Sequence, residues 1–208
     1  MPELFKMRGH RSSITWIPVL AAILCAAAGF FLQPHAGDLF RIHAAQAEPA
    51  DGALFQPIAK VLRDPRCMNC HPVGDRPRQG DDRHFHLQNV TRGADDMGFV
   101  NLRCPACHRN ENNTYSQVPG APNWHLAPLS MGWEGLNDAQ LCTVLKDQSK
   151  NGGRDVAALV EHMSSDKLVL WGWNPGGNRK PVSTPHDQFV DQLHTWQAAG
   201  APCPSPKL

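Results

Sequence analysis

The longest apolar stretch of the 208-residue chain lies near its N-terminus, over residues 14–32. Three basic residues precede it: Lys6, Arg8 and Arg11. A small-x-small site, Ala45-Gln46-Ala47, lies beyond it, and this order of features is typical of an export signal. A stretch of 19 residues is also long enough to span a bilayer. We therefore expect residues 1–47 to be a cleaved signal peptide or an uncleaved membrane anchor with one transmembrane helix.

Both alternatives place residues 48–208 outside the cytoplasm. Positive charges ahead of an apolar run keep that end of the chain in the cytoplasm and direct the rest of the chain to the other side of the membrane. We therefore expect a protein of the periplasm that is either soluble or anchored to the inner membrane.

After residue 47 the apolar positions recur with helical spacing in short segments. These are residues 55–63, 137–151, 155–163 and 184–200. Asn137, with Gln140 three positions later, and Asp155 are typical N-caps, and Pro185 suits a first turn. Residues 72–103 and 109–136 show no sustained period, and no segment shows a strand pattern. The pattern predicts a mainly α fold with a few short helices and much irregular backbone.

The charge of residues 48–208 is nearly balanced, with 16 Lys and Arg against 17 Asp and Glu. Such a balance gives no indication of nucleic-acid binding, which favours a strongly basic surface. The chain also contains 18 Pro and 17 Gly and has few long apolar runs, so a core made of protein alone would be thin.

Two copies of Cys-x-x-Cys-His, the attachment signal for c-type haem, begin at Cys67 and Cys104. Two thiols three positions apart reach the two vinyl groups on one edge of the porphyrin and form thioethers, and the next residue, His, binds the iron. We expect two covalently bound haem c groups, attached through Cys67, Cys70, Cys104 and Cys107, with His71 and His108 as proximal iron ligands.

Two haems would bury large apolar faces and supply much of the core. We therefore expect one small haem-packed domain over residues 48–208. Residues 48–115 would form its haem-attachment part and residues 116–208 its more helical part. A structural zinc site is the alternative, because two Cys-x-x-Cys pairs can supply four thiolates to one metal ion. Such a site has no need of a His after both pairs, so the sequence favours haem.

The sixth iron ligands have several candidates. His86 and His125 are the first choices, because apolar residues after His86 can fasten its loop and His125 lies between Trp124 and Leu126 before a Pro. Met131, His162 and His84 are the reserve candidates. A thioether ligand from Met131 would raise the haem potential relative to two His ligands. For each of these residues an ordinary packing role is also open.

Cys142 and Cys203 are the remaining thiols of residues 48–208. An oxidising compartment favours a disulfide between them. On the chain-entropy description, closing a loop of about 60 residues contributes roughly 4 kcal/mol. Two unrelated thiols are the alternative.

With these motifs the chain resembles diheme c-type cytochromes. The segment from Cys67 to His108, with His84-Phe85-His86 between the motifs, is similar in layout to the small diheme subunit of periplasmic nitrate reductase. That family places one distal His between its motifs, which His84 or His86 would match. It places another ahead of the first motif, whereas here no His lies between residue 47 and Cys67. The second distal ligand would then come from downstream.

Residues further along resemble a group of bacterial exported proteins. The similar segments are residues 119–124, 131–135, 146–147 and 151–154. Those proteins are labelled as cytochrome-like or as isoquinoline 1-oxidoreductase subunits. The resemblance implies an electron acceptor for a molybdenum-containing oxidoreductase.

The motifs and the supply of His and Met favour an electron carrier with two six-coordinate haems. Its partner would be a redox protein, either a molybdenum-containing oxidoreductase or a respiratory component of the membrane. The alternative is a diheme enzyme in which one iron keeps an open position, lined by His84, Arg83 or Arg92, for peroxide or another small molecule. No catalytic acid–base pair is evident in the sequence.

Overall fold

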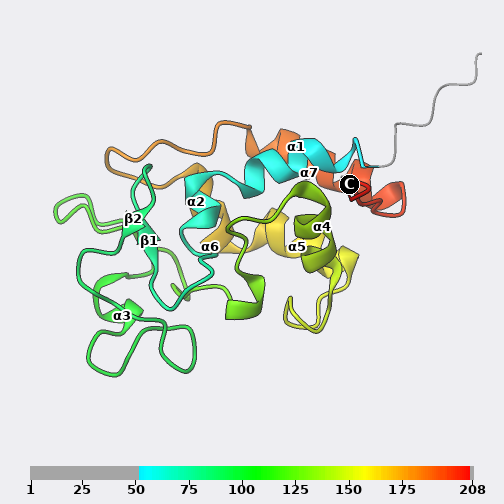
Figure 1. The fold of residues 1–208 in the computed structure, drawn as a ribbon. Coiled ribbons are helices and arrows are strands. Elements are labelled where there is room, and N and C mark those ends of the chain that lie inside the picture. The colour runs from blue at the N-terminus through cyan, green and yellow to red at the C-terminus, as the bar shows by residue number, and fades with distance from the viewer. Residues whose placement is uncertain (1–51, 207–208) are drawn as a thin grey trace, which may run out of the picture. The chain divides into compact units, whose positions relative to one another are not determined.

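The computed structural model describes residues 52–206, so the expected export segment, residues 1–47, lies outside the described residues. The described part is mostly helical, as expected (Figure 1). Its helices are α1 (Phe55–Leu62), α2 (Pro65–Met68), α3 (Cys104–Cys107), α4 (Asp138–Lys146), α5 (Val156–Ser165), α6 (Lys167–Leu170) and α7 (His186–Ala198), with 3-10 turns η1 (Leu129–Met131) and η2 (Trp171–Trp173). Within residues 52–206, none of these helices has both the length and the apolar character needed to cross a bilayer.

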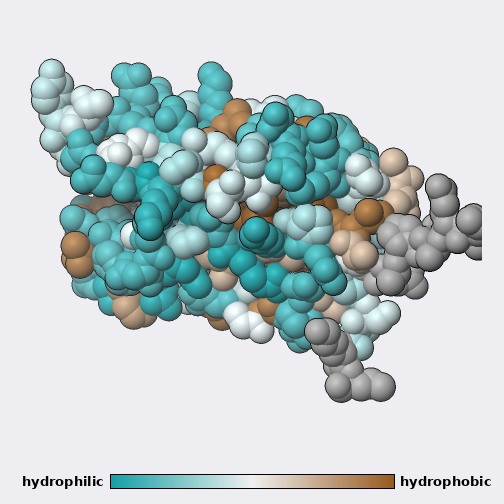
Figure 2. Space-filling model, turned by 90° about the horizontal axis from the view of Figure 1, so that it is seen from above, coloured by the Kyte–Doolittle hydropathy of each residue, from teal (hydrophilic) through white to brown (hydrophobic). Residues whose placement is uncertain are grey.

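The apolar core lies between α1, α4, α5 and α7. In Figure 1, α1 and α7 run side by side with α4 and α5 beneath them, and α1 contacts both α4 and α7. Phe55 of α1 packs on Trp196 of α7 with ring centroids 5.6 Å apart. Ile58, Leu141 and Leu193 are also almost completely buried. Figure 2 shows one face of the exterior, which is mainly hydrophilic and has apolar residues only in small patches.

Local capping explains where α4 and α5 begin. The Asn137 side chain accepts from the Gln140 backbone N–H at 2.9 Å, and the Gln140 side chain accepts from the Asn137 N–H at 2.9 Å, which completes a capping box. Asp155 caps α5 by accepting from the Ala158 N–H at 2.8 Å. The last helix starts at His186 with Pro185 in the N-cap position, so its first turn has no side-chain cap.

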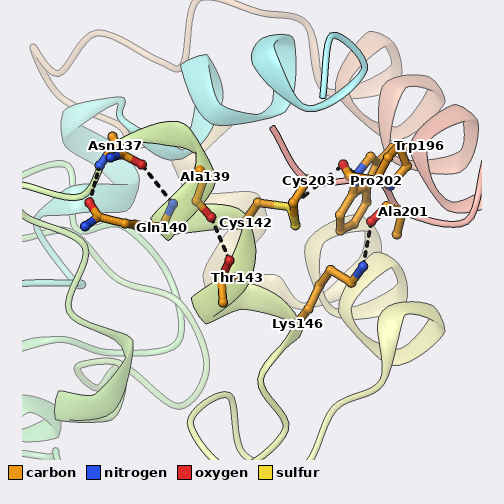
Figure 3. The surroundings of a disulfide bond; sticks show 10 residues. All are labelled: Asn137, Ala139, Gln140, Cys142, Thr143, Lys146, Trp196, Ala201, Pro202 and Cys203. Atoms are coloured by element: carbon orange, nitrogen blue, oxygen red, sulfur yellow. Dashed lines mark hydrogen bonds between the residues drawn. A yellow bond between two sulfur atoms is a disulfide. The ribbon is translucent and has the colours of Figure 1, made fainter. Parts of the chain in front are cut away.

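A disulfide joins α4 to the C-terminal segment. It links Cys142 to Cys203, and Figure 3 shows the contacts around it. Lys146 donates to the Ala201 carbonyl at 2.7 Å, and the Trp196 indole N–H donates to the Pro202 carbonyl at 2.9 Å. The C-terminal segment is thereby held against both α4 and α7.

Residues 72–128 contain little regular structure, as expected. Besides the four-residue helix α3, this region has an antiparallel pair of two-residue strands, β1 (Arg78–Gln79) and β2 (His84–Phe85), which the sequence pattern did not predict. Strands of two residues are too short to produce an alternation of apolar and polar positions. The buried Arg92 holds this region together, because its guanidinium donates to the Asp96 carboxylate and to the carbonyls of Ala127 and Gly74.

Candidate haem sites

Both Cys-x-x-Cys-His motifs begin in a short helix, and in the first the helix ends at Met68, so Cys70 follows in a turn closed by its N–H to the Cys67 carbonyl at 3.1 Å. The first begins in α2, which Asp64 caps by accepting from the Arg66 N–H at 2.9 Å. The second forms α3. Residues three positions apart on a helical turn lie on the same face, so each turn presents its two thiols together. All four motif cysteines have free thiols.

The histidines of the two motifs are held in the same way. Nδ1 of His71 lies 2.8 Å from the Met131 carbonyl oxygen, and Nδ1 of His108 lies 2.8 Å from the Pro119 carbonyl oxygen. A carbonyl can only accept, so Nδ1 carries the proton and Nε2 keeps its lone pair. A fixed tautomer with a free Nε2 is the form that a His ligand needs, and this type of second contact is nearly universal for metal-binding His.

A glycine comes directly after each of these carbonyls, and the sequence pattern gave no indication of its role. Gly132 comes after Met131, and a Cβ there would lie 2.9 Å from the Pro72 carbonyl oxygen. Gly120 comes after Pro119, and a Cβ there would overlap the backbone of Glu111. The carbonyls reach the imidazoles because the next residue lacks a side chain.

Each of these imidazoles also stacks on an indole. The centroids of His71 and Trp133 are 3.4 Å apart with 12° between the planes. The centroids of His108 and Trp124 are 4.4 Å apart with 1° between the planes. The carbonyl and the indole together fix the direction in which Nε2 points.

Burial sets the protonation of these groups. It lowers the pKa of His71 to about 3 and also lowers the pKa of His108, so both rings are neutral at pH 7, the form that binds metal. Burial raises the pKa of Cys70 to about 11 and raises that of Cys67, where the Asp64 carboxylate adds to the effect. At pH 7 these two thiols are therefore protonated, and a protonated thiol is a weak nucleophile.

Two cavities adjoin the two motifs. The first, of about 150 Å³, is lined by Cys67, Cys70 and His71 together with residues of α5, η1 and η2. The second, of about 510 Å³, is lined by Cys104, Cys107 and His108. The walls of both are mainly apolar, as a porphyrin face requires.

The structure sorts the candidate sixth ligands between these cavities. Met131 and His162 line the first, His86 lines the second, and His125 lines both. His84 lines neither, because its Nδ1 is held 2.6 Å from Asp82 beside the β1–β2 pair. The Met131 backbone lies behind the His71 ring, where its carbonyl meets Nδ1.

His86 lies near His108, and both line the second cavity. The ring centroids of His86 and His108 are 6.1 Å apart with 71° between the planes. Two imidazoles that bind one metal ion from opposite sides, each at about 2 Å, have centroids about 6 Å apart. Nδ1 of His86 is buried and has no hydrogen-bond partner in the described structure.

A shared wall separates the two cavities. Four residues line both of them: Arg66, Cys70, His125 and Trp171. Arg66 is only 4% exposed and pairs with Asp81. Trp171 packs edge-on against Trp124 with centroids 4.9 Å apart. The two sites are therefore neighbours, which the separation of 37 residues between Cys67 and Cys104 did not reveal.

Comparison with known proteins gives no relative: no protein-family model matches the chain, and no curated protein or solved structure is detectably similar. Within residues 52–206 no group of three or more His, Cys, Asp or Glu side chains is arranged to hold a metal ion by itself.

Proposed function

We propose that the protein is a diheme c-type cytochrome that transfers electrons in the periplasm. The observation that carries this proposal is the repeated arrangement at the two motifs. Each has two thiols on one turn, a His whose Nδ1 is bound by a carbonyl, an indole against that His, and an apolar cavity beside it. A zinc site would account for the four thiolates, but it would explain neither the free Nε2 atoms nor the two apolar cavities.

In this proposal the chain has distinct tasks at each site. The motif cysteines would form the thioethers, and His71 and His108 would hold the iron through Nε2. Haem iron, when bound, changes between the ferrous and ferric states and so carries one electron. Trp133 and Trp124 keep the proximal rings in place and exclude water from them. The buried Arg66, in the shared wall, supplies positive charge to both sites.

The neighbouring cavities support electron exchange between two haems within one domain. Haems in these sites would complete the apolar core of the part between α2 and α3, where regular structure is scarce. The partner would be a redox protein, either a molybdenum-containing oxidoreductase or a respiratory component of the inner membrane.

The mass of the mature protein, produced with its export segment in a host that attaches c-type haem, tests this proposal. We expect two added haems. Cys67→Ala with Cys70→Ala should remove one haem, and Cys104→Ala with Cys107→Ala the other. Cys142→Ser with Cys203→Ser is the matched control and should keep both. A protein without covalent haem would overturn the proposal.

A second candidate function is a diheme enzyme in which the second iron keeps an open position. The larger volume of the second cavity, about 510 Å³ against about 150 Å³, favours it. A high-spin ferric signal in the resting protein, together with turnover of peroxide with an artificial electron donor, would support this candidate. Two low-spin signals and no turnover would exclude it.

A further inference from the structure

We infer that His162 is the sixth ligand of the first haem and that Asp166 positions it and strengthens its binding to iron. A consequence is that the first haem has the lower reduction potential of the two. This inference rests on the proposed function, because it assigns roles toward the haem held by Cys67 and Cys70.

Asp166 is fixed by two contacts at the junction of α5 and α6. One carboxylate oxygen accepts from the Leu168 N–H at 2.8 Å and caps α6. The other lies 3.1 Å from Nδ1 of His162, one helical turn earlier. With Nδ1 bound to the carboxylate, Nε2 of His162 is the nitrogen that remains for a metal, and His162 lines the first cavity.

The competing ligands of the first cavity are less suited. The Met131 backbone lies on the Nδ1 side of the His71 ring, the side away from Nε2, because its carbonyl oxygen contacts Nδ1. His125 has its Nδ1 against the Asn123 carbonyl, within its own loop, and it lines the wall that both cavities share. His162 alone among the three comes from a helix of the core and has a carboxylate partner.

The two distal histidines therefore differ in one respect. His162 has a carboxylate on Nδ1, whereas Nδ1 of His86 has no hydrogen-bond partner in the described structure. Each site also has an arginine near its distal His. Arg154 lines the first cavity, and Arg76 donates to the His86 carbonyl at 3.5 Å. Among the charged residues, Arg154 and Asp166 line only the first cavity, whereas Arg78, Arg103 and Arg179 line only the second, so the second site is the more positive one and Asp166 is the negative charge of the first.

A carboxylate on Nδ1 makes an imidazole more basic and a better electron donor to a metal. A stronger donor stabilises ferric iron over ferrous iron, which lowers the reduction potential, and hydrogen bonds to the axial ligand are one of the means by which a protein tunes haem. Electrons that enter at the first haem would then move downhill to the second.

The positioning role of Asp166 is tested with Asp166→Asn. Asn is as good an N-cap as Asp, so α6 keeps its start, but the carboxylate charge on His162 is lost. Redox titration followed by absorption should show one potential raised and the other unchanged. Asp82→Asn is the matched control, since it breaks a similar Asp–His pair, at His84, that touches neither cavity. Equal potentials in Asp166→Asn and the unaltered protein would overturn the role of Asp166.

The ligand assignment is tested by low-temperature electron paramagnetic resonance on His162→Ala and His125→Ala. His162→Ala should convert one low-spin signal to high-spin, and added imidazole should restore it. His125→Ala should keep two low-spin signals. Two low-spin signals in His162→Ala would overturn the assignment. Intact mass separates this failure from failure of the proposed function, because a protein with two haems and an unchanged spectrum refutes the inference alone.

Discussion

The imidazole of His108 and the indole of Trp124 lie parallel, with 1° between their planes and 4.4 Å between their centroids. The same indole meets Trp171 edge-on, and Trp171 belongs to the wall between the two cavities. Contacting aromatic rings thus run from His108 through Trp124 to Trp171, which lines both cavities. Trp124 is therefore in contact with both His108 and the wall that the two cavities share.

Trp124→Leu should loosen the proximal ring of the second site without removing it. The Pro119 carbonyl would still hold Nδ1, but the ring could rotate about that hydrogen bond. We expect the low-spin signal of the second haem to broaden while the first is unchanged. Trp133→Leu should do the reverse, since Trp133 stacks on His71. Electron paramagnetic resonance line widths measure both effects, and broadening of both signals in either variant would contradict the prediction.

Gly120→Ala should displace the Pro119 carbonyl from His108, because the added Cβ would overlap the Glu111 backbone. Inserting a methyl group into a packed site costs about 1–3 kcal/mol. Gly132→Ala should have the smaller effect, since its Cβ would lie 2.9 Å from the Pro72 carbonyl oxygen, a less severe overlap with the backbone than the one at Gly120. Urea unfolding of both variants measures the costs. A larger loss of unfolding free energy in Gly132→Ala than in Gly120→Ala would contradict the prediction.

Arg66→Met should lower both reduction potentials. A buried positive charge favours the ferrous state, and Arg66, 4% exposed, lines both cavities. At an effective dielectric constant of about 20, a unit charge at a distance of about 10 Å contributes roughly 1.7 kcal/mol, which is roughly 70 mV for a one-electron couple. Asp81 offsets part of this. Arg63→Met, whose partner Asp138 lies on α4, is the control and should leave both potentials unchanged.

Removing the disulfide with Cys142→Ser and Cys203→Ser should reduce the free energy of unfolding by about 4 kcal/mol, because the crosslink closes a loop of 61 residues. Denaturant unfolding of the oxidised proteins measures the change. The absorption spectrum should stay the same, since neither cysteine lines a haem cavity. A changed spectrum would mean that the disulfide also shapes the sites.

The Asp95–Arg103 pair should make stability depend on pH at the acid end. Two hydrogen bonds of 2.8 Å from Arg103 hold the pKa of Asp95 below its ordinary value. A group whose folded-state pKa is lowered contributes stability above its unfolded pKa, about 4, and loses it as the pH falls through the folded value. Asp95→Asn should therefore be less stable than the unaltered protein at pH 7, and the difference should vanish once the pH falls below the lowered pKa of Asp95. Unfolding midpoints across this range measure it.

Elements that depend on local chemistry were predictable from the sequence. The start of α4 results from the reciprocal hydrogen bonds of Asn137 and Gln140, and the start of α5 from the cap that Asp155 provides. The short α6 and η2 were not predicted, because four and three residues give too little periodicity to recognise.

The spacing of each motif predicts which thiols and which His would hold a haem, and this stays a prediction. The sequence did not show which residues face these motifs, because His125 and His162 reach the first cavity from a loop and a helix far along the chain. His162 lies 91 residues beyond His71, and no pattern in the sequence connects them. A local signal did exist, since Asp166 lies four residues after His162, the spacing at which helical side chains meet.

The cysteines of the described residues form two groups that differ in oxidation state. Cys142 and Cys203 are oxidised together, while the four motif thiols stay reduced and available. In the proposed exported protein the chain would enter an oxidising compartment N-terminus first, so the motif thiols would arrive before Cys142, and Cys142 well before Cys203. During that interval Cys142 would be a thiol able to pair wrongly, and six cysteines allow about 15 complete pairings. Haem attachment to the motif thiols would then have to precede their oxidation, and their early place in the chain would favour this order.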